Sequence, residues 1–332
     1  MKTSCKIFFS VLLSGLLFAG PAGSTSMSSS LLARFQHELV SHAALHHQPL
    51  QLTAAAILAR SVSGMPSVLR YSTLLHRAQE RAFAGPAVTW AALGDCGDRQ
   101  NLSDCINIAA LQHLEQQAPD NAAIWLLAFD HASQADDLAG QEHFLHRAAD
   151  ATVFRTYYAT LLQALIRTVA AQLMPPDVVH SISGRQGNAP AAIYLLAAGN
   201  LMYLPTPALA PPFAFCTEHS QLRGVCLRLA KNLIRGDTVT ARAAGLALTQ
   251  RLTDNPAQRQ WAARQQRALA WRTQQFSGLV LRARHDVRIA QILLGLARQG
   301  DTENNIQQAL LRKMNRALNP PGNWNPDGLS KN

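Results

Sequence analysis

Apolar residues recur every three or four positions along almost the whole chain, which is the spacing that places them on one face of an α-helix. The clearest stripes lie within residues 125–132, 161–169, 222–233 and 306–314. No stretch alternates apolar and polar residues over the length of a strand. Helix-breaking clusters separate the stripes: FAGP at 83–86, APDN at 118–121, MPPD at 174–177, GRQGNAP at 184–190, RGD at 235–237, DNP at 254–256 and RQGD at 298–301. The pattern predicts an all-α fold of stacked antiparallel helix pairs.

One segment, APDNAAIWLLAFDHASQADDLAGQEHFLHRAADA at 118–151, resembles a tetratricopeptide-type repeat or its Sel1-like relative. The matching positions are Pro119, Trp125, Ala128 and Ala132 in the first half and Leu145 and Ala148 in the second. Phe129 and Gln141 depart from the family's small residues, and a weaker echo lies at 85–96. The resemblance implies a right-handed superhelix of helix pairs with a concave binding surface. It implies no catalysis.

A proline-rich segment at 205–215 predicts a boundary, because proline cannot continue a helix. The charge changes sign there. From 24 to 215, ten Lys and Arg oppose thirteen Asp and Glu, whereas from 216 onwards eighteen oppose seven. We therefore expect an N-terminal helical domain at 24–204, a linker at 205–215, a basic C-terminal helical domain at 216–318 and a disordered tail at 319–332.

The first residues have the order of a secretory signal peptide. Lys2 and Lys6 give a positive start, an apolar run follows from Ile7 to Ala19, and small residues come next. The sequence predicts cleavage after about residue 23, and it contains no run of about 20 apolar residues that would span a bilayer. Arginine outnumbers lysine 25 to 5 and alanine is abundant, which indicates a GC-rich bacterial genome. We expect a soluble periplasmic protein.

Four of the five cysteines form two closely spaced pairs, Cys96 with Cys105 and Cys216 with Cys226, while Cys5 lies in the predicted signal. Exported cysteines meet an oxidising compartment, and four cysteines allow three pairings. The short loops favour the two local pairings. A four-thiolate zinc site is the alternative, although its half-sites usually place two to four residues between ligands. Each second cysteine is expected near a helix start, so each bridge would tie a loop or the end of the preceding helix to the next helix.

The basic C-terminal half contains the clearest candidate binding residues. Arginines and tryptophans gather on one predicted helix: Arg259, Arg264, Arg267, Arg272, Trp261 and Trp271. Such a face would attract an acidic protein by long-range electrostatics, with a tryptophan as the buried anchor. An anionic membrane or envelope polymer is an alternative partner. The arginines could also form a solvated helix face that binds no partner. Export argues against nucleic acid.

A possible metal site lies near the N-terminus, where Glu38, His42 and His46 are spaced four residues apart on a predicted helix. Polar helix edges explain this spacing without a metal, and no HExxH motif is present. The sequence also lacks a GxSxG elbow and the glycine-rich phosphate-binding motifs. It calls for no cofactor and no small-molecule ligand.

These features predict an exported, non-catalytic protein-binding module. It would act either as an adaptor in envelope assembly or as an immunity-type inhibitor that neutralises an antibacterial effector. A peptidoglycan-active or metal-dependent periplasmic hydrolase is the alternative, because paired carboxylates need not be close in sequence.

Overall fold

The computed structural model describes residues 25–96 and 106–325, and these residues form a helical fold without strands. Within these described residues, sixteen α-helices follow one another: α1 (Thr25–Ala43), α2 (Pro49–Arg60), α3 (Tyr71–Gln79), α4 (Pro86–Ala92), α5 (Ile108–Gln117), α6 (Ala122–Gln134), α7 (Leu138–Asp150), α8 (Tyr158–Ala170), α9 (Pro176–Ser183), α10 (Ala189–Leu201), α11 (Ala210–Glu218), α12 (Arg223–Ile234), α13 (Val239–Leu252), α14 (Pro256–Ala283), α15 (Val287–Arg298) and α16 (Glu303–Lys313). The all-α prediction is confirmed for this part of the chain.

Local signals explain where most of these helices begin. Eight helices start behind a side chain that accepts a hydrogen bond from a backbone N–H of the first turn: Asn107, Asn121, Asp137, Asn188, Thr238, Asn255, Asp286 and Thr302. Proline occupies the first turn of α2, α4, α9, α10, α11 and α14, where its missing N–H costs no helical hydrogen bond. Several predicted helix breakers are thus helix starts.

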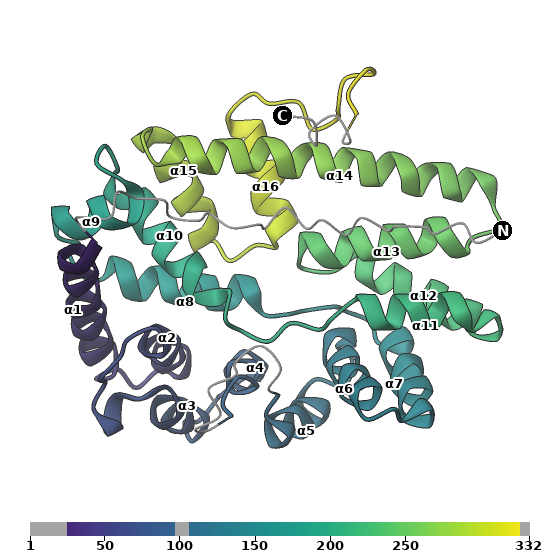
Figure 1. Cartoon of the computed structure of the whole chain (residues 1–332), viewed down its shortest axis with the longest axis horizontal. Helices are drawn as coiled ribbons and strands as arrows, with labels where there is room; N and C mark the ends of the chain where they lie inside the picture. The colour runs from purple at the N-terminus through teal and green to yellow at the C-terminus, as the bar shows by residue number, and fades with distance from the viewer. Residues whose placement is uncertain (1–24, 97–105, 326–332) are drawn as a thin grey trace.

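The helices pack in a closed circuit (Figure 1). Each helix from α4 to α7 packs on the next, α7 packs on α12, and the contacts continue through α13 and α14 to α15. The circuit closes because α15 packs on α8, α8 on α2, and α2 on α4. In Figure 1 the row from α2 to α7 lies along the lower edge and α14 along the upper edge, with α8 between them.

One hydrophobic cluster fills most of this circuit, from Phe35 on α1 to Leu311 on α16. It draws residues from both sides of the proline-rich segment, so the two predicted domains share a core. A second, smaller cluster of Leu246, Ala262 and Leu269 lies between α13 and α14. None of the described helices combines the length and the apolar character needed to cross a bilayer.

The repeat-like segment 118–151 contains two helices, α6 and α7, which pack on each other. Trp125 on α6 and Leu145 on α7 are buried, and Trp125 donates its indole N–H to the carbonyl of Pro119 at 2.8 Å. The Arg147 guanidinium lies over the Trp125 ring, 4.3 Å from its centroid. The carbonyl of Pro119, which precedes α6, therefore holds the Trp125 side chain of that helix in place.

Two segment predictions need correction. The proline-rich segment is not wholly a linker, because α11 begins at Ala210 with two prolines in its first turn. The segment 319–325 is placed against α14 rather than disordered, because Arg267 donates to the carbonyls of Pro321 and Gly322, both at 2.9 Å. Residues 326–332 and the predicted signal peptide lie outside the described residues.

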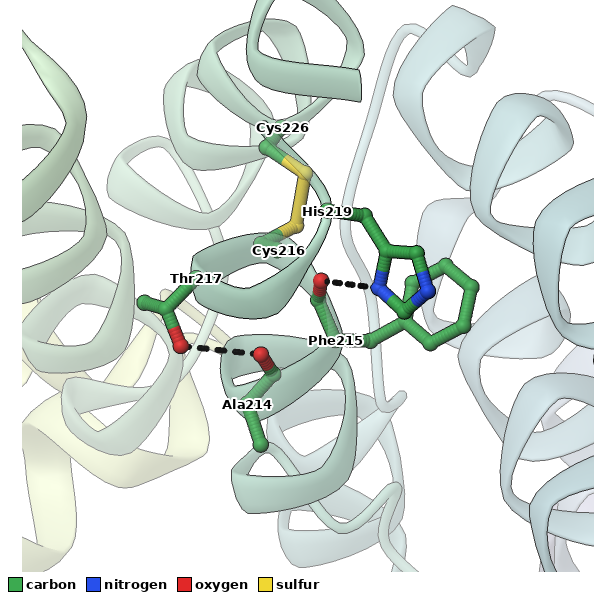
Figure 2. Close-up of a disulfide and its surroundings, with 6 residues drawn as sticks. All are labelled: Ala214, Phe215, Cys216, Thr217, His219 and Cys226. Carbon is green, nitrogen blue, oxygen red and sulfur yellow. Dashed lines mark hydrogen bonds between the residues drawn. A yellow bond between two sulfur atoms is a disulfide. The ribbon is translucent and has the colours of Figure 1, made fainter. Parts of the chain in front are cut away.

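The bridge between Cys216 and Cys226 is present and joins the last turn of α11 to the start of α12 (Figure 2). The two Cα atoms are 5.8 Å apart, which is an ordinary separation for a disulfide. Beside the bridge, His219 stacks on Phe215 with ring centroids 4.0 Å apart. This pairing confirms one of the two predicted staples. The predicted partner of Cys96, Cys105, lies outside the described residues.

Candidate functional site

A cavity of about 690 Å³ opens where helix starts and connecting segments meet inside the circuit of helices. Its walls come from the start of α2 at 48–50, the start of α4 at 85–88, residues 155–160 before and in α8, and the start of α16 at 300–302. Phe83 and Asp237 complete the lining. The volume falls in the range of ligand-binding pockets, which are about 300–1,000 Å³. We take this cavity as the candidate functional site.

Two aromatic residues of the cavity hold left-handed backbone conformations, Phe83 with φ of 67° and Tyr157 with φ of 57°. This conformation costs an L-residue roughly 1–2 kcal/mol. Bulky residues rarely adopt it, and strained residues of this kind tend to gather at functional sites. Phe83 is also fully exposed, so packing of its ring does not offset the strain.

Tyr157 owes its position to a buried asparagine at the start of α6. The Asn121 side chain donates to the carbonyl of Arg155 at 2.8 Å and to the hydroxyl of Tyr157 at 3.4 Å, and it accepts from the Arg155 N–H at 2.9 Å. The Tyr157 ring lies 5.6 Å from that of Trp90, and its burial raises the pKa of the phenol. These contacts fix the segment before α8 against both α4 and α6.

Asp237 fixes the same segment from the opposite side. Its carboxylate accepts from the backbone N–H of Thr156 at 2.8 Å and from the Thr156 hydroxyl at 3.3 Å. Burial of Asp237 raises its pKa to about 6, because desolvation outweighs these hydrogen bonds. The Asp237 carbonyl accepts from the N–H of Glu303 at 3.0 Å, and the Glu303 carboxylate accepts from the N–H of Val239 at 2.8 Å.

The cavity therefore combines an apolar lining with a few fixed polar groups. Pro49, Leu50, Val88 and the two aromatic rings supply apolar surface, whereas Arg155 supplies an exposed positive charge. Such a lining would bury an apolar group of a ligand, and the polar groups at its edge would fix the ligand's orientation. Both oxygens of Asp237 are already engaged by Thr156, which favours a positioning role for that carboxylate.

The predicted basic face on α14 is not assembled as expected. Arg272 is buried, with only 7% of its surface exposed, and so it does not belong to an exposed face. Arg267 is bound to the carbonyls of the C-terminal segment, and Arg259 donates to the carbonyl of Thr253 at 2.8 Å. Arg264 alone among the four predicted arginines is exposed without a hydrogen bond to the described chain.

The two predicted tryptophan anchors on α14 differ in environment. Trp261 is 38% exposed, and so it keeps the accessibility that a contact residue needs. Trp271 is half-buried, donates its indole N–H to the carbonyl of Ala317 at 2.9 Å, and meets the ring of Trp324 edge to face. The C-terminal segment therefore covers the surface on which the sequence placed Trp271 and Arg267.

The candidate metal ligands Glu38, His42 and His46 are all exposed on or just after α1. The rings of His42 and His46 meet edge to face, 5.7 Å apart, beside a small cavity of about 30 Å³ that Arg167 also lines. The positive charge of Arg167 disfavours a cation there. Within residues 25–96 and 106–325, no group of three or more His, Cys, Asp or Glu side chains is arranged to hold a metal ion.

Comparison with known protein families, with curated proteins and with solved structures gives no match. The assignment of a site therefore depends on the geometry of this chain. The cavity residues were not among the predicted functional residues, although Phe83, Asp237 and Gly300 lie in three predicted helix breakers, FAGP, RGD and RQGD. The sequence pattern does not predict that turn residues so far apart in the chain lie close together in the fold.

Proposed function

We propose that the protein is a non-catalytic binding module that captures an apolar segment of another protein in the central cavity. The observation that carries the proposal is Phe83, a fully exposed phenyl ring on a left-handed backbone at the wall of a cavity of about 690 Å³. An exposed aromatic ring contributes a large contact area to a complex.

The charge distribution favours an acidic partner. The whole sequence has a formal net charge of +10. At the cavity itself, the exposed positive charge of Arg155 is offset by the exposed carboxylate of Asp301, so the attraction comes from the chain as a whole. Charges of this kind raise the association rate with a partner of opposite sign, whereas burial of apolar groups supplies most of the affinity. The partner in this proposal is an acidic protein with an exposed apolar segment.

The role of the module is that of an exported adaptor or of an immunity-type inhibitor of an antibacterial effector. The predicted signal peptide and the Cys216–Cys226 bridge support an oxidising compartment such as the periplasm. The resemblance of 118–151 to a tetratricopeptide-type unit supports protein binding, because such repeats serve as binding scaffolds. The identity of the partner distinguishes the two roles.

A periplasmic hydrolase is the second candidate, and one observation favours it. Asp237 and Asp301 line the same cavity, and the raised pKa of Asp237, about 6, is the kind of perturbation found in general acids. Its hydrogen bonds to Thr156 favour the positioning role instead. Release of dye from labelled peptidoglycan by the wild type, lost on Asp237→Asn, would establish the hydrolase.

The binding proposal is tested by photo-crosslinking in the native host. A benzophenone amino acid replaces Phe83 in the full chain, and a matched protein carries it at Leu173, which is 96% exposed and lies outside the cavity lining. We expect a discrete protein adduct from position 83 that position 173 does not give.

The captured protein is then purified, and its affinity is measured by calorimetry for the wild type, Phe83→Ala and Leu173→Ala. We expect at least a tenfold loss for Phe83→Ala, about 1.4 kcal/mol or more, with unchanged circular dichroism. Identical adducts from both positions, or wild-type affinity of Phe83→Ala, would exclude the cavity as the binding site.

A further inference from the structure

The chain after α16 lies against α14 as a segment with little buried surface, the C-terminal segment of residues 315–325 (Figure 1). It begins at Asn315, whose φ of 52° is the left-handed conformation that often follows the end of a helix. None of its residues is buried: Leu318, Pro320 and Trp324 are half-buried, and the other eight are exposed. Segments with so few buried contacts open locally at a small fraction of the free energy that unfolds the whole fold.

Two side chains of α14 hold the C-terminal segment by its backbone. The Arg267 guanidinium donates to the carbonyl of Pro321 at 2.9 Å and to that of Trp324 at 3.1 Å. The Trp271 indole N–H donates to the carbonyl of Ala317 at 2.9 Å. The Trp324 ring adds a side-chain contact, because it meets the Trp271 ring edge to face with the centroids 5.4 Å apart. Every extended segment has backbone carbonyl groups, so a segment of another protein that carries an aromatic residue can form the same contacts.

The C-terminal segment leaves the positive charge of α14 without a negative partner. From Arg259 to Arg272 the helix has four arginines and no acidic residue, and residues 315–325 contain no acidic residue either. The ion pairs found among the described residues include neither Arg264 nor Arg267. Arg267 therefore binds neutral carbonyl groups, whereas its hydrogen bonds to a carboxylate would be about twice as strong. An acidic segment would thus form stronger contacts with this helix than the C-terminal segment forms.

The contacts of the C-terminal segment lie beside an arginine that is already free. Arg264 precedes Arg267 by three positions and Trp271 by seven, so the three side chains share one face of α14. Arg264 is exposed, and Arg267 and Trp271 are half-buried. Opening of the C-terminal segment would therefore expose two guanidinium groups, an indole N–H and an aromatic ring together. This set fits an extended segment that supplies carboxylates and one aromatic residue.

We propose that the C-terminal segment is autoinhibitory: it covers a binding face of α14, from which an extended acidic segment of a partner protein, carrying an aromatic residue, displaces it. The partner's carboxylates bind Arg264 and Arg267, and its aromatic ring takes the place of Trp324 against Trp271. The lining of the cavity includes no residue of α14 or of 315–325, so this face is independent of the function proposed for the cavity. A segment that covers the face in about 90% of molecules weakens the partner's binding about tenfold.

The binding face is tested with a fluorescein-labelled peptide, DPPGDWD, which copies residues 319–325 with aspartate in place of the three asparagines. Fluorescence anisotropy measures its binding to the mature protein at low salt, with the neutral peptide NPPGNWN as reference. We expect the acidic peptide to bind more tightly than the neutral one and to lose affinity as salt is added.

Substitutions in the same protein separate the covering segment from the face beneath it. Trp324→Ala weakens the hold of the C-terminal segment and should strengthen binding of the acidic peptide about tenfold. Added to Trp324→Ala, Arg267→Met should weaken the peptide about tenfold or more, because it removes the charge-assisted hydrogen bonds. Arg282→Met is the matched control, since Arg282 is exposed in the last turn of the same helix, and it should leave binding unchanged.

Hydrogen exchange of the wild type provides a second readout, because displacement must free the C-terminal segment. The bound acidic peptide should speed amide exchange within residues 316–325, and Arg267→Met without peptide should do the same. If Arg267→Met fails to fold, Trp271→Phe replaces it, since it keeps an aromatic ring and removes the indole donor. Equal peptide affinity of the wild type and Trp324→Ala, or bound peptide without faster exchange, would overturn the proposal. Vesicles of anionic phospholipid that free the segment when the peptide does not would assign the face to a membrane instead.

Discussion

At the scale of single residues, Phe83 combines a fully exposed ring with a φ of 67°. Neither feature stabilises the folded chain by itself. Glycine adopts positive φ without steric cost, although it also makes the unfolded chain more flexible. Because the exposed ring of Phe83 packs on nothing, a glycine at this position removes the backbone strain without removing packing contacts.

We expect Phe83→Gly to leave the free energy of unfolding unchanged or to raise it by about 1 kcal/mol, because relief of the strain offsets the added chain entropy. Urea unfolding at neutral pH provides the measurement. Leu173→Gly is the control: Leu173 is almost fully exposed and is not among the residues with positive φ, so glycine should cost about 0.4–1 kcal/mol there. A larger loss at Phe83 than at Leu173 would contradict the assignment of strain.

Asp130 on α6 is buried with one unpartnered oxygen, Oδ1, while Oδ2 accepts from the N–H of Ala208 at 2.7 Å. Desolvation raises its pKa to about 7. The folded-state pKa lies above the unfolded value near 4, so the folded chain binds this proton more tightly than the unfolded chain does. As the pH rises from about 4 to about 7, the ionisation of Asp130 therefore lowers the free energy of unfolding.

Asp130→Asn should remove that contribution. We expect the variant to be more stable than the wild type by about 2–4 kcal/mol at pH 8, and to differ much less at pH 4. Urea unfolding at the two pH values tests this, with the exposed Asp120→Asn as control. A stability difference that is the same at both pH values would show that ionisation of Asp130 is not the cause.

At the scale of elements, the Cys216–Cys226 bridge ties α11 to α12 across a ten-residue separation. The two cysteines are buried, and the loop they close is short, so the bridge restricts the unfolded chain moderately. It also fixes the turn that carries His219 against Phe215 (Figure 2).

Cys216→Ala with Cys226→Ala should lower the free energy of unfolding by roughly 2–3 kcal/mol while binding through the cavity persists. Non-reducing peptide mapping of the wild type should join Cys216 to Cys226, and we predict the same for Cys96 with Cys105. A bridge between Cys96 and Cys216 would refute the local pairing. Loss of binding at full stability would make the α11–α12 turn a contact surface.

The C-terminal segment covers part of α14. Its carbonyl groups accept hydrogen bonds from Arg267 and Trp271, and Trp324 lies edge to face with Trp271. A predicted binding stripe is therefore partly an intramolecular contact. On α14, three of the predicted contact residues remain exposed: Arg259, Trp261 and Arg264.

At the scale of the whole molecule, the closed circuit of helices explains why a cavity exists at all. An open array of repeats would place each unit only against its neighbours. Here α2 packs on α8 and α15 packs on α8, which brings residues near 50, 85, 157 and 301 to one place. The cavity belongs to no single helix pair.

We also predict that the chain is exported and processed. Intact mass spectrometry of protein recovered from a periplasmic fraction should show the loss of about the first 23 residues and formed disulfides. A replacement of Phe8 and Leu12 by aspartate should retain the unprocessed chain in the cytoplasm, because the apolar run drives export. Full-length protein of unprocessed mass in the periplasm would contradict the cleavage prediction.

Much of the fold was predictable because it depends on near neighbours in sequence. Apolar spacing fixed the helical class, and capping side chains and prolines fixed where helices such as α10 and α14 begin. The Cys216–Cys226 bridge was predictable for the same reason, since its two ends are ten positions apart.

Only the tertiary structure decided which polar residues are free and which are engaged. An arginine on an amphipathic helix has the same local pattern whether it faces solvent, as Arg264 does, or lies buried, as Arg272 does. Its environment is set by α13, α16 and the C-terminal segment, which approach α14 through packing rather than through sequence proximity. The cavity follows the same rule. Phe83, Tyr157, Asp237 and Gly300 are isolated turn residues in the sequence, and they share a site because the circuit of helices closes around them.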